Sequence, residues 1–208
     1  VTLTLLGMEV KPACRGVRTF AYNSCMSSRP FLYIVATPIG DYADITLRAL
    51  ETLRAVDIII CEERRQGSAL LKKLGVVSKE LLEINEHNEA VQVPNLINRL
   101  LLGNLSAALI SDCGTPVFSD PGPLLINQAV AMGITVSPIP GASSLMAALS
   151  ILDFNASQFV FGGFLSRVPQ QRQRELTRLR GLRMPVILMD TPYRMAALLD
   201  DVIKVFGK

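Results

Sequence analysis

A loop rich in glycine, proline and hydroxyl-bearing residues follows a short apolar run near the middle of the chain. The apolar run is Ala107–Ile110, and the loop reads SDCGTPVFSDPG from Ser111 to Gly122. Proline fixes φ and glycine permits positive φ, so we expect this backbone to hold one non-repeating shape. Gly114 would also leave room for a ligand to touch the main chain. An ordinary strand-to-helix connection would not need so many glycine, proline and hydroxyl-bearing residues. The loop composition therefore predicts a ligand site at the carboxyl end of a strand.

Two further glycine-containing turns also follow apolar runs. Phe31–Thr37 ends at Pro38-Ile39-Gly40, and Thr135–Ile139 ends at Pro140-Gly141-Ala142-Ser143-Ser144. We expect the three loops to converge, because the carboxyl ends of parallel strands meet at one edge of a sheet. None of them contains the glycine patterns of a dinucleotide fold or a phosphate-binding loop, and the chain has no G-x-S-x-G element of a hydrolase. What remains is a cofactor held mostly by main chain, hydroxyls and apolar contacts.

These loops need a sheet to hold them, and the chain alternates apolar runs with helical periodicity as far as about residue 153. A strand buried on both faces of a parallel sheet is apolar throughout, so the runs predict strands. Apolar stripes between them predict helices, one capped by Asp44 and a later one opened by Pro94. We therefore expect an α/β fold with a mainly parallel sheet. The predicted strands are 31–37, 58–61, 81–84, 107–110 and 135–139.

Three segments are expected along the chain. Residues 1–29 show no sustained period and are predicted to be a poorly ordered N-terminal extension, with a natural start near Met26. Residues 30–153 form the predicted N-terminal domain, and residues 154–208 a smaller, truncated α/β C-terminal domain. Its expected strands are 159–165 and 185–189, and its expected helices are 170–179 and 193–206.

Composition limits the classes of partner. Half of the 208 residues are hydrophobic, and the net charge of +3 permits an acidic partner such as RNA without requiring one. The four cysteines have no C-x-x-C spacing and the chain has one histidine, so no metal site is expected. Cys61 and Cys113 are expected to be reduced, buried thiols of a cytoplasmic protein. No apolar run in the sequence approaches the length of a membrane span.

An ordered set of short motifs resembles one known family. Together they are similar to the ribosomal RNA small-subunit methyltransferase I family, within the tetrapyrrole-methylase-like (class III) S-adenosylmethionine methyltransferases. The resemblance runs from about Pro30 to Gly207. It implies two α/β domains with the cofactor between them, a homodimer, and methylation of the ribose 2′-hydroxyl of a cytidine in 16S ribosomal RNA of the small subunit. The motifs begin at Val35 (VATPIG), Asp44 (DITLRALE), Glu86 (EHNE), Ser111 (SDCGTP), Ser119 (SDPG), Pro140 (PGASS) and Phe161 (FGGFL).

The resemblance also implies which residues bind S-adenosylmethionine. They come from the three loops and, in the second domain, from the segment that would close over the cofactor. A sulfonium group prefers apolar or carbonyl neighbours to a cation, and these residue types are compatible with that preference. The implied residues are Pro38, Ile39, Gly40, Gly114, Thr115, Pro116, Phe118, Ser143, Ser144, Leu188 and Met189.

Methyl transfer to a ribose hydroxyl is an in-line displacement, in which the protein aligns the oxygen and helps to remove a proton. The candidates for this proton transfer or for orientation are Glu62, Glu86 and Asp112. Arg65 and Asn88 are candidates for holding a phosphate or a base edge, although Glu62-Glu63-Arg64-Arg65 is equally readable as a solvated or interface salt-bridge cluster. An arginine-rich stretch is either an RNA-backbone surface or a solvated helix face. Its members are Arg167, Arg172, Arg174, Arg178, Arg180 and Arg183.

The sequence departs from the family pattern at three places, and other interpretations stay open. Asp41-Tyr42 stands where Asn-Leu is usual, Glu63-Arg64 where Asp-Thr is usual, and Asp190-Thr-Pro-Tyr-Arg where a Glu-Ser-Pro-His-Arg type sequence is common. One alternative is a tetrapyrrole or corrin methylase of the same fold. Another is an inactive, truncated dimerising module.

Overall fold

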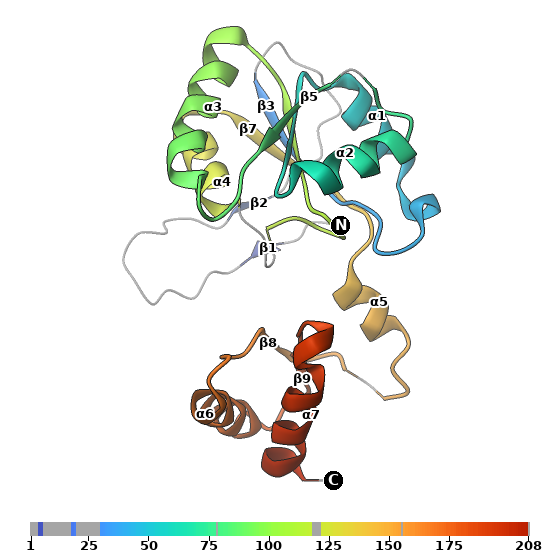
Figure 1. Cartoon of the computed structure of the whole chain (residues 1–208), viewed down its shortest axis with the longest axis vertical. Coiled ribbons are helices and arrows are strands. Elements are labelled where there is room, and N and C mark those ends of the chain that lie inside the picture. The colour runs from blue at the N-terminus through green and yellow to red at the C-terminus, as the bar shows by residue number, and fades with distance from the viewer. Residues whose placement is uncertain are drawn as a thin grey trace.

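The computed structural model describes residues 4–5, 18–19, 30–77, 79–117, 122–154 and 156–207. Most of these residues form a five-stranded sheet with helices on both of its faces, and the remainder form a smaller unit at the C-terminal end of the chain (Figure 1). Helix α5 (Ser144–Ser150) lies on the path between the two (Figure 1). The division of the chain at residue 153 stays a prediction.

The large sheet is parallel throughout, as the sequence predicts. Its strands lie in the order β5-β4-β6-β3-β7. The central strand β6 and its neighbour β4 are buried along their whole length, which explains their uniformly apolar sequences. The strands are β3 (Phe31–Val35), β4 (Ile58–Cys61), β5 (Glu80–Glu83), β6 (Ala107–Ile110) and β7 (Thr135–Ile139).

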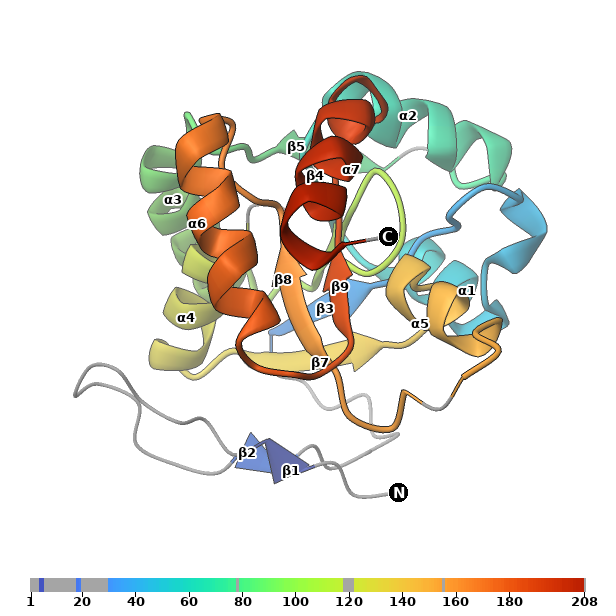
Figure 2. The same ribbon diagram turned by 90° about the horizontal axis from the view of Figure 1, so that it is seen from below.

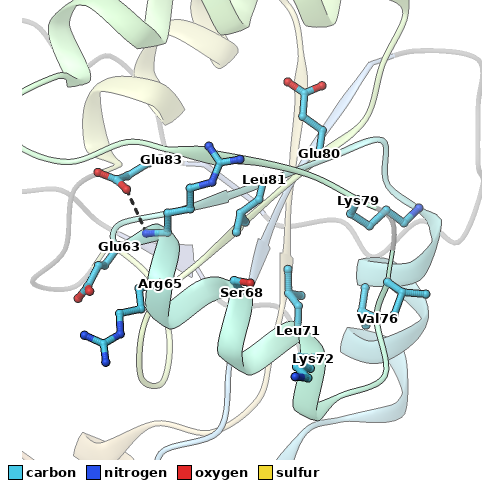
Figure 3. Close-up of a pocket in the computed structure, with 12 residues that line it drawn as sticks. Glu63, Arg65, Ser68, Leu71, Lys72, Val76, Lys79, Glu80, Leu81 and Glu83 are labelled. Atoms are coloured by element: carbon cyan, nitrogen blue, oxygen red, sulfur yellow. Dashed lines mark hydrogen bonds between the residues drawn. The ribbon is translucent and has the colours of Figure 1, made fainter.

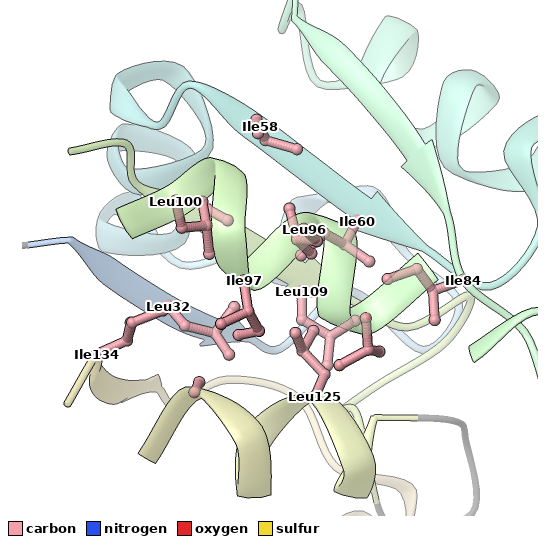
Figure 4. Packing of buried hydrophobic residues seen from close by; sticks show 13 residues of the cluster. Leu32, Ile58, Ile60, Ile84, Leu96, Ile97, Leu100, Leu109, Leu125 and Ile134 are labelled. Carbon is pink, nitrogen blue, oxygen red and sulfur yellow. The ribbon is translucent and has the colours of Figure 1, made fainter. Parts of the chain in front are cut away.

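Two pairs of helices cover the two faces of this sheet. On β4, Ile58 and Ile60 point into one apolar cluster, whereas Ile59 and Cys61 point into the other. The first cluster packs under α3 (Glu89–Gly103) and α4 (Pro123–Ala131), as Figure 4 shows. The second packs under α1 (Leu47–Ala55) and α2 (Arg64–Lys73). The two-sided core fixes the register of the strands and therefore the positions of the loops at their carboxyl ends.

Two predicted helix starts were wrong. Asp44 is the last residue of a short 3-10 helix, η1 (Tyr42–Asp44), and α1 is capped instead by Thr46, whose Oγ1 accepts a hydrogen bond from the Ala49 amide at 3.1 Å. Pro94 does not open α3 but lies inside it. The helix begins earlier because the Asn88 carbonyl already accepts hydrogen bonds from amides of its first turn.

The smaller unit consists of two parallel strands and two helices. Strands β8 (Val160–Gly163) and β9 (Val186–Leu188) pair with each other, while α6 (Pro169–Arg180) and α7 (Pro192–Phe206) pack together. Helix α7 begins at the end of this unit that faces the large sheet and ends on the far side (Figure 1), and Figure 2 shows the smaller unit from below, in front of the large sheet. Its small core is formed by Leu165, Leu176, Leu179 and Leu198.

Little of the N-terminal segment is described. Strands β1 (Thr4–Leu5) and β2 (Arg18–Thr19) pair antiparallel. The prediction for residues 1–29 otherwise lies outside the described residues. Among the described residues, no helix combines the length and the apolar character that crossing a membrane requires.

Candidate functional site

The three loops predicted to converge are held together by hydrogen bonds. The Thr37 amide donates to the Gly114 carbonyl at 2.8 Å, and its hydroxyl reaches the Ser111 carbonyl at 3.0 Å and the Gly114 carbonyl at 3.2 Å. The Thr115 hydroxyl donates to the Ala142 carbonyl at 3.1 Å. In the sheet, β3 lies between β6 and β7. These hydrogen bonds join the loop after β3 to the loop after β6, and the loop after β6 to the loop after β7. The predicted convergence is confirmed.

Thr37 is the residue on which this arrangement depends, and the sequence reading did not single it out. Its side chain is buried, with the residue only 1% exposed. A buried hydroxyl without a partner would be destabilising, and here two carbonyls satisfy it. The only sequence signal was a threonine that follows a strand and directly precedes proline.

Gly114 lies where the loop after β3 approaches closely. Its φ is +84°, and a Cβ at this position would lie 3.2 Å from Cγ2 of Ile39 and 3.7 Å from the Ala142 carbonyl. Gly141 is similarly tight, since a Cβ there would lie 3.0 Å from Cβ of Ala36. A side chain at either position would crowd these neighbours, so glycine is what allows the loops to lie this close together.

The predicted cofactor residues fall into two groups in the structure. Most lie on the three loops: Pro38, Gly114 and Pro116 are buried, Ile39 and Ser143 half-buried, and Gly40, Thr115 and Ser144 exposed. Ser143 also caps α5 by accepting a hydrogen bond from the Met146 amide. Leu188 and Met189 lie apart from them at the end of β9, where the Met189 amide donates to the Gly163 carbonyl at 3.0 Å. Phe118 lies outside the described residues, and all of these binding roles stay predictions.

Two of the predicted carboxylates follow neighbouring strands. Glu62 follows β4 and is half-buried, while Asp112 follows β6 and is exposed. Burial raises the pKa of the Cys61 thiol to about 12, and the carboxylates of Asp112 and Glu83 add to this shift. The thiol therefore stays protonated. Cys61 is buried as predicted, whereas the prediction that Cys113 is buried was wrong, because it is exposed on the loop after β6.

Two other predicted residues lie on the turn after β5, at one edge of the described sheet. The Glu86 side chain is 84% exposed and lies 3.5 Å from Nε2 of His87. Asn88 accepts a hydrogen bond from the Asn85 amide at 2.9 Å and donates to the Glu83 carbonyl at 3.2 Å. The amide group of Asn88 thus shapes the turn, and β4 separates this turn from the loop after β6. The structure does not bring these residues into the hydrogen-bonded loop cluster.

Arg65 lines a groove of about 880 Å³ between α2 and β5 (Figure 3). The groove carries both signs of charge, because Arg64 and Lys72 line it together with Glu80 and Glu83. The Arg64 amide donates to Oε2 of Glu83 at 3.1 Å (Figure 3). None of the lining residues comes from the three tied loops. Whether Arg65 holds a phosphate therefore stays a prediction.

The arginine-rich stretch divides into one buried and several exposed side chains. Arg172 is buried and binds Oδ2 of Asp201 through Nη2 at 2.6 Å and Nε at 2.8 Å. The hydrogen bond from Gln173, followed by that from Arg172, lowers the pKa of Asp201 to about 2. Arg172 therefore joins α6 to α7, and its assignment to an exposed basic surface was wrong. The exposed members are Arg167, Arg174, Arg178, Arg180 and Arg183, of which Arg180 donates to the Val205 carbonyl.

Metal ligation has no geometric support in the described part of the chain. There, no group of three or more histidine, cysteine, aspartate or glutamate side chains is arranged to hold a metal ion.

Comparison with known proteins agrees on one family. Residues 31–207 match the family model of the Tetrapyrrole (Corrin/Porphyrin) Methylases. A protein of Mesorhizobium japonicum named ribosomal RNA small subunit methyltransferase I is 44% identical over 178 residues, which cover 86% of this chain and 60% of that protein. A protein of the same name from Leptospira biflexa is 38% identical over 175 residues, covering 84% of this chain and 72% of the relative. The chain thus spans about 60% of the length of the Mesorhizobium relative.

Solved structures confirm the fold. A crystal structure of diphthine synthase superposes with a TM-score of 0.66 at 17% identity, covering 84% of this chain and 71% of that chain. Uroporphyrin III C-methyl transferase from Thermus thermophilus superposes with a TM-score of 0.60 at 16% identity, covering 86% and 78%. At these identities the likeness extends to the fold alone.

Proposed function

The chain belongs to the tetrapyrrole methylase family and, within it, to the ribosomal RNA small-subunit methyltransferase I family, and from this membership we propose that it methylates RNA. The proposed reaction transfers a methyl group from S-adenosylmethionine to the ribose 2′-hydroxyl of a cytidine in 16S ribosomal RNA. The observation that carries the proposal is the cluster of three tied loops, in a chain about 40% identical to proteins named as ribosomal RNA methyltransferases.

The loop cluster fits S-adenosylmethionine, which supplies an electrophilic methyl group when bound. Residues 36–40, 111–117 and 140–144 contain no lysine or arginine, so no cation opposes a sulfonium there. Gly114 and Gly141 would present main-chain hydrogen-bonding groups, while Pro38 and Ile39 would offer apolar contact. Leu188 and Met189 would approach from the smaller unit. This combination matches a cleft that binds a small molecule through backbone groups and apolar walls.

Asp112 is the residue that we infer to accept or orient the proton of the ribose hydroxyl. It is the one charged residue within 36–40, 111–117 and 140–144, and it lies two residues before Gly114 on the loop after β6. A carboxylate placed there would orient the hydroxyl oxygen towards the methyl group and take up its proton. Glu62, at the end of the neighbouring strand β4, is the second candidate for the same role.

The partners and location follow from the same membership. The small ribosomal subunit is the proposed RNA partner, and the exposed arginines of α6 and its flanks would contact its phosphates. A homodimer acting in the cytoplasm is the proposed assembly. The relatives named as ribosomal RNA methyltransferases favour RNA over a tetrapyrrole as substrate, because their identity to this chain far exceeds that of the solved tetrapyrrole methylase.

Calorimetric titration with S-adenosylmethionine tests the site before any RNA is added. We expect saturable one-to-one binding, and the same stoichiometry for the product S-adenosylhomocysteine. NAD serves as the control, because the chain lacks the phosphate-binding fingerprint of a dinucleotide fold and should give no binding heat. A folded protein that binds neither S-adenosylmethionine nor S-adenosylhomocysteine would contradict the proposal.

A further inference from the structure

Two adjacent residues just before α7 each have one buried side-chain polar atom without a partner. The Asp190 side chain is only 1% exposed. One of its oxygens, Oδ1, lies 3.2 Å from Nε of Arg194 and accepts a hydrogen bond from the Thr191 amide at 2.8 Å. The other oxygen, Oδ2, and Oγ1 of Thr191 have no hydrogen-bond partner among the described residues.

This pattern is unusual for Thr191 because it occupies a capping position. A threonine before a helix normally accepts a hydrogen bond from an amide of the first turn through its hydroxyl. Here the amides of Arg194 and Met195 are satisfied by the Thr191 main-chain carbonyl, and the hydroxyl makes no capping bond. The hydroxyl is therefore not needed for the helix.

Buried polar atoms without partners are costly, and native proteins pair nearly all of them. A carboxylate oxygen and a hydroxyl on consecutive residues, both buried and both without partners, therefore indicate a position where a hydrogen-bonding group completes the structure. Oδ2 of Asp190 can only accept, so the missing group must be a donor. A phosphate is disfavoured, because the carboxylate would repel the anion that a helix N-terminus otherwise attracts.

The segment also lies at the right place for a ligand of the loop cluster. It directly follows Leu188 and Met189 at the end of β9, and α7 begins at the end of the smaller unit that faces the large sheet (Figure 1). Tyr193, two residues after Thr191, is 91% exposed. An exposed aromatic residue next to hydrogen-bonding groups suits the flat, donor-bearing surface of a nucleoside.

We propose that Asp190 and Thr191 form a nucleoside-binding corner, in which Oδ2 accepts a hydrogen bond from an amino or hydroxyl group of the ligand. The Thr191 hydroxyl, which can donate or accept, binds a neighbouring atom of the same nucleoside. The nucleoside comes from one of two sources: the adenosine part of the methyl donor or the target nucleotide of the RNA. This inference rests on the proposed function and adds to it two residues that bind substrate.

The test is the substitution Thr191→Val, which removes the hydroxyl and keeps the shape of the side chain. Because the hydroxyl has no partner in the protein, the melting temperature should stay the same or rise. Binding of S-adenosylhomocysteine should weaken about threefold to tenfold if the methyl donor occupies the corner. If the RNA nucleotide occupies it, that affinity stays unchanged and the affinity for 30S subunits falls by the same factor.

Four further variants complete the comparison. Thr135→Val makes the same change at the amino end of β7, opposite the loops, and should leave both affinities unchanged. Thr191→Ser keeps the hydroxyl and should bind with wild-type affinity. If the valine variant does not fold, Thr191→Ala takes its place and is compared with Thr191→Ser. Asp190→Asn removes the charge from the accepting group and should weaken the same ligand by about tenfold or more.

The outcomes separate this inference from the function on which it rests. If the wild-type protein fails to bind S-adenosylhomocysteine, the proposed function is wrong. If the wild-type protein binds both S-adenosylhomocysteine and 30S subunits, and removal of the Thr191 hydroxyl changes neither affinity, the nucleoside-binding corner is wrong. A Thr191→Val variant that loses stability along with affinity, without rescue by serine, would likewise assign a merely structural role.

Discussion

Replacing Gly114 by alanine should damage cofactor binding more than it damages the fold. The φ of +84° is costly for any L-residue, by about 1–2 kcal/mol. The new Cβ would also meet Cγ2 of Ile39 at 3.2 Å, so the Ile39 side chain must shift by a few tenths of an ångström. For a protein of this size the backbone cost corresponds to a fall of about 2–8 °C in the melting temperature.

The chain offers a matched control in Gly133, at the end of α4. Its φ is +78°, and a Cβ there would find no atom within 4 Å. Gly133→Ala therefore carries a similar backbone strain without the collision, and it lies just before β7, at the opposite edge of the sheet from the loops. The two variants should lose similar stability in thermal unfolding.

Only Gly114→Ala should lose affinity in a calorimetric titration with S-adenosylhomocysteine. We expect its Kd to rise by about tenfold or more, equivalent to about 1.4 kcal/mol, because the methyl group displaces Ile39 and narrows the space beside the main chain. Wild-type affinity in Gly114→Ala would refute the placement of the cofactor. Equal losses of affinity in Gly114→Ala and Gly133→Ala would show that the effect is a general loss of stability.

Three further predictions concern catalysis, acid stability and RNA binding. Asp112→Asn should lower kcat for methyl transfer by about 10²–10⁴-fold while the affinity for S-adenosylhomocysteine stays within twofold, about the level of error; a normal rate would exclude Asp112 as proton acceptor. The pKa of Asp201 is lowered to about 2, mainly by the hydrogen bond from Gln173. The charged carboxylate therefore stabilises the fold at any pH above about 4, the ordinary pKa of aspartate, and this stability is lost as the pH falls from about 4 towards 2. Melting curves of wild type and Asp201→Asn should therefore differ at neutral pH and converge near pH 2, whereas a constant difference would contradict the pKa. Joint replacement of Arg174 and Arg178 by glutamine should reduce the slope of log affinity for 30S subunits against log salt by about 1.4, and an unchanged slope would remove α6 from the RNA interface.

Much of the larger unit could be predicted from local sequence, because its strands are buried on both faces. Ile58–Cys61 and Ala107–Ile110 are uniformly apolar runs, and the structure contains them as strands with these same bounds. The convergence of the three loops followed from parallel topology alone. The helix starts were less predictable, since Asp44 and Thr46 are both good capping residues, and only the turn formed by Tyr42–Asp44 decides between them.

Side-chain partners across the chain were harder to predict. Arg172, Leu176 and Leu179 share one face of α6, so helical spacing alone could have indicated that Arg172 points inwards. Its partner Asp201 lies 29 residues away, and no local pattern reports that pairing. Asp190 and Thr191 look like an ordinary helix start in sequence. Their unpaired atoms become visible only when the hydrogen bonds of the β9–α7 turn are known.

An assay of methyl transfer to ribosomal RNA is the decisive experiment for the proposed function. The purified chain would be incubated with 30S subunits and S-adenosylmethionine carrying a labelled methyl group, and the ribosomal RNA then digested to nucleosides for chromatography and mass spectrometry. The proposed function predicts the label in 2′-O-methylcytidine and its disappearance in Asp112→Asn. Absence of label from the RNA, in a protein that binds S-adenosylmethionine, or label on a base instead of a ribose, would contradict it.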